Sequence, residues 1–467
     1  MNTRMHIFCM KQFDKMICIV LLFGALLSTS LRSAAQNNNR NDTVESLTLN
    51  QCIGYALKHQ PGLNQAMINI SIAKTTNAIN LSGWLPQVNL SGNLIHYEQL
   101  PTSFVANQAV PGGPPIQTRT GIVNTAIPEL SATQTIFNPQ LLFAAKSAKL
   151  YVAAADQATD SSKIFLVSSI SKSFYSLLLT LEQIGVLKED TARLNRNVMD
   201  TYHQFVGGIV DETDYDEAII TLNNSVAQLK QQVENVTPQY AVLKQLMGYP
   251  PEKQFNVAYD TLQMMQEIYY DTMQPMQYEK RIEYQQLQTA RKLQREQTNY
   301  YRLAFLPTVS GFYNYYYEYE SNTFSNLFSN AYPYSYIGIS LNMPLFTGFS
   351  RVENVHRSRL QEDIVNWAEV SLKSEINTEF TTAMANYKSN LYNWQILKDN
   401  ERLAKNVYRI VSLQYKQGIV AYLNMIVAES NLIAAEVGYT NALFQLLSSK
   451  IDLEKAAGNI SYNTLTN

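Results

Sequence analysis

The densest group of side chains that could bind a metal ion is an acidic run that begins at Asp211. Its five carboxylates are of the kind that Ca²⁺ prefers, and they belong to Asp211, Glu212, Asp214, Asp216 and Glu217. A calcium loop of the EF-hand type also needs a glycine near its sixth position and a later glutamate ligand, and this run has neither. Acidic side chains at the start of a helix interact favourably with its dipole. We therefore interpret Asp214 and Glu217 as helix-start residues and predict no metal site.

The remaining reactive side chains form no catalytic arrangement. The five histidines are scattered along the chain, at positions 6, 59, 96, 203 and 356. The sequence has no glycine-rich phosphate loop, zinc-ligand spacing or nucleophile elbow. A net charge of −2 gives no signal for nucleic acid or another polyanion. We therefore predict that the protein is not an enzyme, needs no cofactor and does not bind nucleic acid.

Residues 1–35 have the layout of a secretory signal peptide. Lys11 and Lys15 precede an apolar run over 16–27, and a stretch of small residues ends at Ala35, after which we place the cut. A membrane anchor is the alternative, but the apolar run is short for a span. Cys52 is then the only cysteine of the mature chain, so no internal disulfide is expected and no cysteine stands at the cut to carry a lipid.

One later stretch has the pattern of a wall between lipid and water. Its apolar side chains alternate with small and polar ones, so that one face carries Ile337, Ile339, Leu341 and Met343. The opposite face carries Gly338, Ser340 and Asn342. This alternation is typical of a transmembrane β-barrel strand. Many tyrosines nearby favour the membrane–water boundary, although a soluble, tyrosine-rich hairpin is an alternative.

The mature chain lacks a convincing helical membrane span. Its most apolar long stretch, 164–187, contains Lys172 and Glu182. If the protein lies in a membrane, strands must hold it there. We predict four such strands per chain, and these cannot close a barrel, because the smallest membrane barrels need about eight. The chain must then oligomerise, since unpaired strand edges in lipid are costly.

The mature chain reads as two copies of one plan, over 36–250 and 276–460, joined by a linker at 251–275 and followed by a tail at 461–467. Three pairs of short motifs correspond between the copies: 84–86 with 305–307, 136–137 with 345–346, and 208–210 with 418–420. The last pair has an offset of 210 residues, which also aligns apolar positions in the preceding helices, such as Phe174 with Met384. Generic heptad similarity would align the helices but would not also align the turns.

Each copy reads helix, strand, loop, strand, long helix, turn, helix. In the first copy we predict a helix over 49–81, strands over 88–97 and 121–137 around a Pro/Gly-rich loop at 110–115, and a long helix over 139–206. In the second we predict a helix over 277–304, strands over 309–319 and from 336, a loop over 321–333, and a long helix over 348–417. Each long helix would reach roughly 100 Å. Apolar steps of three and four favour coiled-coil packing, and we expect Thr191 and Thr201 on a side that faces water.

These motifs resemble those of the TolC-like outer-membrane efflux protein family over nearly all of the mature chain. The segments that carry the resemblance are 47–61, Leu306-Pro307, 344–348 and 415–418. The resemblance implies an α+β membrane protein: a homotrimer whose twelve-stranded β-barrel, four strands per chain, lies in the outer-membrane lipid and continues into a periplasmic α-helical coiled-coil barrel. It also implies an inner-membrane pump joined through a periplasmic adaptor.

The two glycine turns become candidate adaptor contacts through this resemblance. Glycine can adopt the left-handed conformation that ends a helix, and the exposed apolar pairs beside it suit a contact surface; the turns are Gly208-Ile209-Val210 and Gly418-Ile419-Val420. The family narrows its tunnel with two aspartates after the second turn, where this chain has Asn424 and Val427. The corresponding first-copy positions are Asp214 and Glu217. This departure argues against the family's cation-sensitive gate.

We expect an outer-membrane exit duct for efflux of small molecules such as drugs, toxic compounds or metal ions. An exit duct for type I secretion of a polypeptide is the main alternative within this class. A soluble coiled-coil structural protein is an alternative from another class. The sequence names neither the cargo nor the pump.

Overall fold

The computed structural model describes residues 45–106, 113–258 and 268–460. The predicted signal peptide and the 461–467 tail lie outside these residues, as do parts of the 110–115 loop and of the 251–275 linker. Residues 46–467 belong to one compact unit, which the following paragraphs describe.

The first half of the unit contains four helices: α2 (Leu49–His59), α3 (Pro61–Ser82), α4 (Pro139–Val206) and α5 (Glu212–Met247). The bounds of α4 are those predicted, because Asn138 caps its start and Pro139 occupies its first position. The single helix predicted over 49–81 was wrong. Gln60 is extended, with ψ 121°, because it precedes Pro61, and the chain breaks there into α2 and α3.

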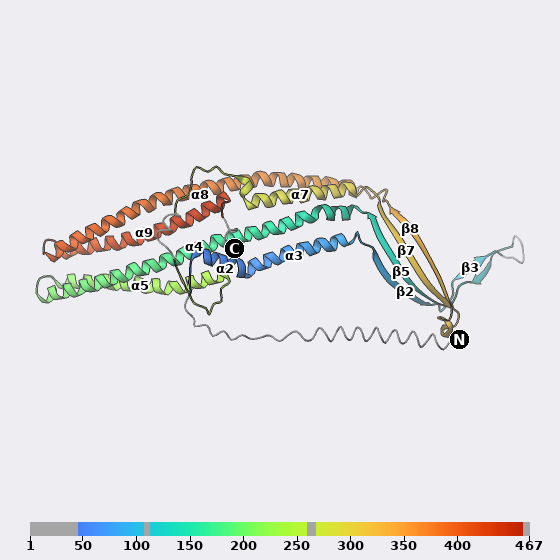
Figure 1. Cartoon of the computed structure of the whole chain (residues 1–467), viewed down its shortest axis with the longest axis horizontal. Helices are drawn as coiled ribbons and strands as arrows, with labels where there is room; N and C mark the ends of the chain where they lie inside the picture. The colour runs from blue at the N-terminus through green and yellow to red at the C-terminus, as the bar shows by residue number, and fades with distance from the viewer. Residues whose placement is uncertain (1–44, 107–112, 259–267, 461–467) are drawn as a thin grey trace. The chain divides into compact units, whose positions relative to one another are not determined.

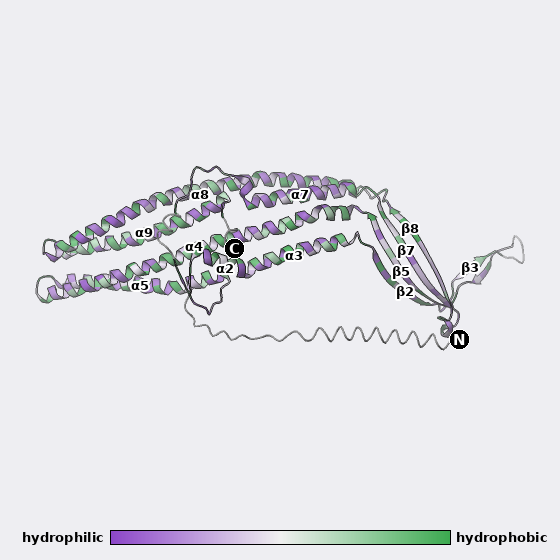
Figure 2. Ribbon diagram, viewed as in Figure 1, coloured by the Kyte–Doolittle hydropathy of each residue, from purple (hydrophilic) through white to green (hydrophobic). Residues whose placement is uncertain are grey.

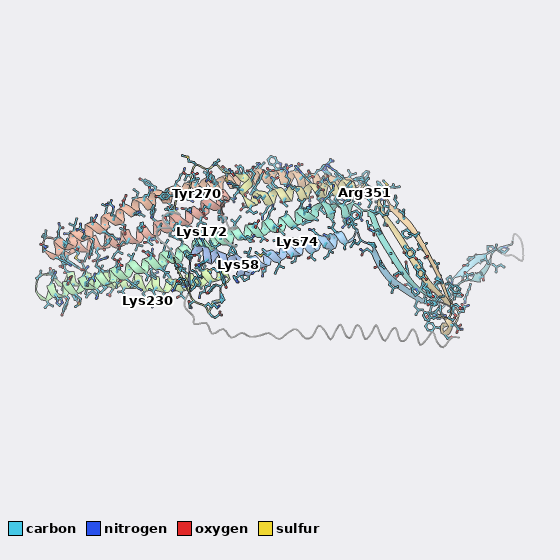
Figure 3. All side chains as sticks on the ribbon, viewed as in Figure 1. Lys58, Lys74, Lys172, Lys230, Tyr270 and Arg351 are labelled. Carbon is cyan, nitrogen blue, oxygen red and sulfur yellow. The ribbon has the colours of Figure 1, made fainter. Side chains whose placement is uncertain are left out.

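The second half follows the same order of helices. A short 3₁₀ turn, η1 (Tyr278–Lys280), precedes α7 (Ile282–Leu303), and the long α8 (Ser350–Lys416) leads to α9 (Tyr422–Ala457). The start of α8 lies after Gly348 and Phe349, which both have positive φ, at 58° and 65°. Arg351 fastens this junction by donating to the carbonyl oxygen of Pro344 at 2.9 Å, and Figure 3 shows Arg351 where the helices meet the strands.

The helices associate as two hairpins, α4 with α5 and α8 with α9, which lie side by side in Figure 1. Helix α3 runs along α4, and α7 runs along both α4 and α8. The two heptad stripes aligned by the 210-residue offset meet in one core cluster, which contains Phe174, Leu177, Tyr387 and Trp394. Figure 2 shows apolar and polar residues alternating along these helices instead of forming blocks.

Two threonines of α4 are placed differently from our prediction. Thr201 is completely buried, and Thr191 is half-buried. Each hydroxyl donates to a carbonyl oxygen one turn earlier in the helix, Thr191 to Leu187 at 2.7 Å and Thr201 to Asn197 at 2.9 Å. The expectation of a water-facing side was wrong for Thr201, because a threonine satisfied by its own helix can be buried, whereas Thr191 keeps part of its surface exposed.

Within the described part of the chain, α4 is the one helix long and apolar enough by composition to cross a membrane. However, 61% of its most apolar 18-residue window is buried inside the structure. The apolar residues of α4 are therefore largely accounted for by packing against the other helices.

The segment that joins the two halves is anchored by buried polar contacts. The hydroxyl of Tyr387 on α8 donates to the carbonyl oxygen of Ile268 at 3.0 Å and accepts from the amide of Tyr270 at 2.9 Å. The guanidinium of Arg281, itself buried, donates to the carbonyl oxygen of Ala456 at 2.8 Å. Figure 3 marks Tyr270 beside α8. These contacts attach the joint to the middle of α8 and to the end of α9.

The strands form an antiparallel sheet in the order β2-β5-β7-β8, with bounds β2 (Gln87–His96), β5 (Asn124–Phe137), β7 (Thr308–Ser321) and β8 (Ala331–Asn342). Strand β8 begins before the predicted position 336 and ends at Asn342, so Met343 lies just outside it. A separate hairpin, β3 (Thr102–Val105) with β4 (Ile116–Arg119), was not predicted. Two further short strands, β1 (Glu45–Leu47) and β6 (Phe255–Val257), pair with each other. The outer edges of β2 and β8 have no strand partner among the described residues.

Candidate functional site

The sheet has one polar and one apolar face, as its register shows. Residues directly opposite each other in antiparallel strands share a face. One row across the four strands is Ser91, Glu129, Tyr316 and Tyr334, and the next is Asn89, Ser131, Asn314 and Tyr336. The alternate rows belong to the other face, and one of them is Val88, Ala132, Tyr313 and Ile337.

The predicted lipid-facing residues share this apolar face. Ile339 and Leu341 continue the face from Ile337, and all three side chains are well exposed in the single chain. Gly338 and Ser340 lie on the polar face, opposite Phe312 and Ser310. The ring of Phe312 lies over Gly338, where a Cβ atom would approach within 2.6 Å of it. The sheet can therefore separate an apolar environment from an aqueous one.

The two glycine turns are nearly identical in geometry. Gly208 and Gly418 have φ angles of 70° and 71°, which confirms the left-handed glycine predicted at each helix end. In both turns the glycine amide donates to the carbonyl three residues earlier, at 2.9 Å. The following isoleucine amide donates to the carbonyl five residues earlier, at 2.8 Å for Ile209 and 2.9 Å for Ile419. This is the hydrogen-bond pattern of a Schellman cap.

The isoleucines of the turns project into open surroundings. Ile209 is 75% exposed and Ile419 is 69% exposed, whereas Val210 and Val420 are half-buried. Val420 packs against a small apolar cluster, the tip cluster, made of Ala218, Tyr415, Tyr422 and Met425. The two predicted contact turns therefore present one apolar side chain each.

The tip cluster brings the two hairpins together, since its members come from α5, α8 and α9. The hydroxyl of Tyr415 donates to Oε1 of Gln204 on α4 at 2.6 Å. Burial raises the pKa of both Tyr415 and Tyr422, and the nearby Asp214 carboxylate adds to this rise. Both tyrosines therefore stay neutral at ordinary pH.

The residues at the predicted gate positions are solvent-accessible in the single chain. Asn424 and Val427 lie near the start of α9, and both are exposed. Asp214 is half-buried in the first turn of α5, and Glu217 is exposed one turn later. The helix start predicted for the acidic run is thus confirmed. The described residues contain no group of three His, Cys, Asp or Glu side chains that could hold a metal ion.

A buried charge network above the tip cluster was missed at the sequence level. Nε of Arg193 on α4 donates to Oε1 of Glu429 on α9 at 2.9 Å, and Nδ2 of Asn197 donates to Oε2 of the same carboxylate at 2.9 Å. Arg193 also pairs with Asp190. Asp190 and Glu429 are each only 1% exposed. A signal existed in the sequence, because Asp190 lies between Leu187 and Leu194 on the apolar stripe of α4.

Helix α8 completes this network. The ring of Tyr408 lies 4.9 Å from the guanidinium carbon of Arg193, within the range of a cation–π contact. Nζ of Lys405 lies 3.5 Å from Oε1 of Glu436 on α9. Burial raises the pKa of Glu429, of Asp190 and of Glu436, and the neighbouring cations oppose this rise. The network therefore links three helices through carboxyl groups that bind protons more readily than exposed ones.

A family model for outer membrane efflux proteins matches residues 52–249 and 279–459, most of the described chain. The chain belongs to the outer membrane efflux protein family. As a member of this family of channels, which is not a family of enzymes, it is an outer-membrane efflux channel whose helical part lies in the periplasm. No curated protein matches the chain.

Three solved structures of outer-membrane proteins share the fold. The outer membrane protein VceC of Vibrio cholerae is 16% identical, over 88% of this chain and 96% of its own, with a TM-score of 0.69. The CmeC outer membrane channel of Campylobacter jejuni is 18% identical, over 89% and 86%, with a TM-score of 0.69. The MtrE outer membrane channel of Neisseria gonorrhoeae is 17% identical, over 91% and 94%, with a TM-score of 0.67.

The buried network predicts a dependence of stability on pH. A carboxyl group whose pKa is higher in the folded than in the unfolded chain stabilises the fold fully below its unfolded pKa, and this contribution is lost as the pH rises through the folded value. Glu429 has such a raised pKa, so we expect the melting temperature of the solubilised protein to fall from pH 5 to pH 8. Glu429→Gln, which mimics the protonated form, should reduce this fall.

Asp190 and Glu436 still titrate in the Glu429→Gln variant, so its melting temperature should still fall with pH, but less steeply. Glu252→Gln, at an exposed position of the joint, serves as the matched control and should melt like the wild type at each pH. If the melting temperature of Glu429→Gln falls with pH as steeply as that of the wild type, Glu429 is already ionised between pH 5 and pH 8.

Proposed function

We propose that three copies of this chain form the exit duct of a tripartite efflux pump, through which small molecules pass from the periplasm to the exterior. The observation that carries this proposal is the two-faced sheet with its two unpaired edges. An apolar face in lipid and a polar face on water are compatible only with a closed wall, because free backbone N–H and C=O groups are not tolerated in the hydrocarbon region.

The two edges differ, which favours a ring. Strand β2 lies at one edge and β8 at the other, so β8 of one copy would pair with β2 of the next. Such a head-to-tail contact generates a closed ring when the rotation closes. Three copies of four strands give the twelve-stranded barrel that the resemblance implies.

The helices beside these edges carry matching exposed stripes. On α3 the exposed apolar residues are Ile68, Ile72 and Ile79, and on α8 they include Leu360, Ile364 and Trp367. Both sets follow helical spacing, and such patches on a single chain mark surfaces that a partner covers. We propose that α8 of one subunit packs on α3 of the next and so continues the ring as a helical tunnel.

The proposal includes two internal repeats, 36–250 and 276–460, as alternating sectors of this wall. The observed order α3-β2-β5-α4-α5 and α7-β7-β8-α8-α9 supports it.

Members of the family act with adaptors and inner-membrane pumps, and the exposed Ile209 and Ile419 are the proposed contacts with the helical hairpins of a periplasmic adaptor. The family description supports efflux, and we propose small molecules such as drugs, toxic compounds or metal ions as the cargo.

The barrel wall can be tested with an arginine on each face. Ile339→Arg would place a charge in lipid and should cost about 2–4 kcal/mol per chain. Ser340→Arg, one residue along β8 on the polar face, should be tolerated. The measurement is the temperature at which the membrane-extracted oligomer loses its slow gel mobility. If this temperature falls equally in both variants, or falls in neither, the result contradicts a wall with lipid on one side.

The tips can be tested by separating docking from assembly. Ile419→Asp should leave the yield of heat-resistant trimer unchanged and lower dye export severalfold, because the side chain is exposed on a turn. Met425→Asp is the contrasting variant, since Met425 is buried in the tip cluster and its loss should lower trimer yield. If Ile419→Asp lowers yield and export together, the turn is not a dedicated adaptor contact.

The gate can be tested by adding and removing carboxylates. We propose that α9 lines the constriction, where Asn424 and Val427 provide no charge. Wild-type channels in a planar bilayer should then resist block by hexaamminecobalt(III) from the periplasmic side. Asn424→Asp should create block through a ring of three charges, and Asp214→Asn should change little. Strong block of the wild type that Asp214→Asn abolishes would place the gate in the first repeat.

A further inference from the structure

We propose that the polar face of the sheet, near its loop end, carries a binding site for aromatic cations, built from a column of stacked tyrosines. The site rests on the proposed function, because it requires the polar face to line the lumen of a barrel. It would give the exit duct a chemical preference of its own, separate from that of the pump.

The column consists of three rings on neighbouring strands. The ring of Tyr316 on β7 stacks on Tyr334 of β8, with 4.8 Å between centroids and 12° between planes. On its other side it stacks on Tyr336, at 5.8 Å and 21°. The hydroxyls of Tyr316 and Tyr336 are 3.1 Å apart, and Nδ2 of Asn314 donates to the Tyr336 hydroxyl at 3.1 Å. These contacts hold the rings in one orientation.

The outer two rings of the column remain accessible. Tyr334 is 45% exposed and Tyr336 is 46% exposed. Both lie on β8, at the edge of the sheet in one chain. Flat, fixed aromatic surfaces of this kind accept another ring by stacking and attract a cation placed over the ring face.

The charged residues of the sheet favour a ligand with a positive charge. In β2, β5, β7 and β8 no residue is lysine or arginine, while the carboxylates Glu129, Glu318 and Glu320 all lie in the rows of the polar face. Glu129 lies directly opposite Tyr316. Three carboxylates per chain become nine in a trimer, and a lumen lined by one sign of charge concentrates the opposite ion. Rings and charge together fit an organic cation with an aromatic group.

The test uses purified full-length trimer in planar bilayers, with benzyltrimethylammonium added from the side of the strand loops. Wild-type current should fall with concentration of this cation, whereas benzenesulfonate, an aromatic anion, should not block. Tyr334→Leu, which removes an accessible ring of the column, should raise the half-blocking concentration about two- to fivefold, the range expected for one exposed cation–π contact. Tyr334→Phe keeps the ring and should be blocked at nearly the wild-type concentration.

Tyr317→Leu is the matched control, because the neighbouring Tyr317 lies on the apolar face, opposite Pro333, and should leave block unchanged. If Tyr334→Leu does not yield heat-resistant trimer, Tyr336→Leu, at the other accessible ring on β8, carries the same expectation. Conducting channels in which these leucine variants block like the wild type, or which benzenesulfonate blocks equally, overturn the tyrosine site alone. Folded trimer that conducts no ions overturns the proposed duct, and the site with it.

Discussion

Backbone hydrogen bonding at the edges of β2 and β8 constrains the whole molecule. Each free N–H or C=O group in hydrocarbon costs several kcal/mol, and a strand of ten or more residues carries many. Four strands cannot satisfy their own edges by closing, and for this reason we propose that other copies of the chain satisfy them. In the proposed ring, the two-faced register would fix which side of the wall faces water, and the helices that leave the strands would follow the same circular order.

The helical part meets a different requirement, because it lies in the periplasm and not in lipid. Its stability comes from the shared core around Phe174, Tyr387 and Trp394, whereas the network of Asp190, Arg193 and Glu429 adds charges to a region already buried. Replacing buried ion pairs with apolar residues is often neutral or stabilising, but removing one partner is costly. We interpret the network as fixing which faces of α4, α8 and α9 meet, with the apolar core supplying most of the stabilisation.

Local sequence signals predicted what local physics decides. Asn138, Pro139 and Gly208 set the ends of α4 to the residue, and strict alternation placed Ile337, Ile339 and Leu341 on one face. The errors arose where a residue distant in the sequence determines the burial or the pairing of a side chain. Thr201 looked like a water-facing position, but it is buried where the two hairpins meet, and Glu429 finds its partner Arg193 from 236 residues away. The Gln60 break was missed because proline suits the first turn of a helix as well as a boundary.

The distribution of charge along the chain separates the two ends of the path in physical terms. At the turns, the proposed gate residues Asn424 and Val427 are uncharged, and Asp214 lies in the first turn of α5. On β2, β5, β7 and β8 every formally charged side chain is a glutamate. In the proposed duct a solute would pass the helices before the strands, so the charge preference that we propose for the barrel would act at the exit. The turns would then remain available for contact with the adaptor.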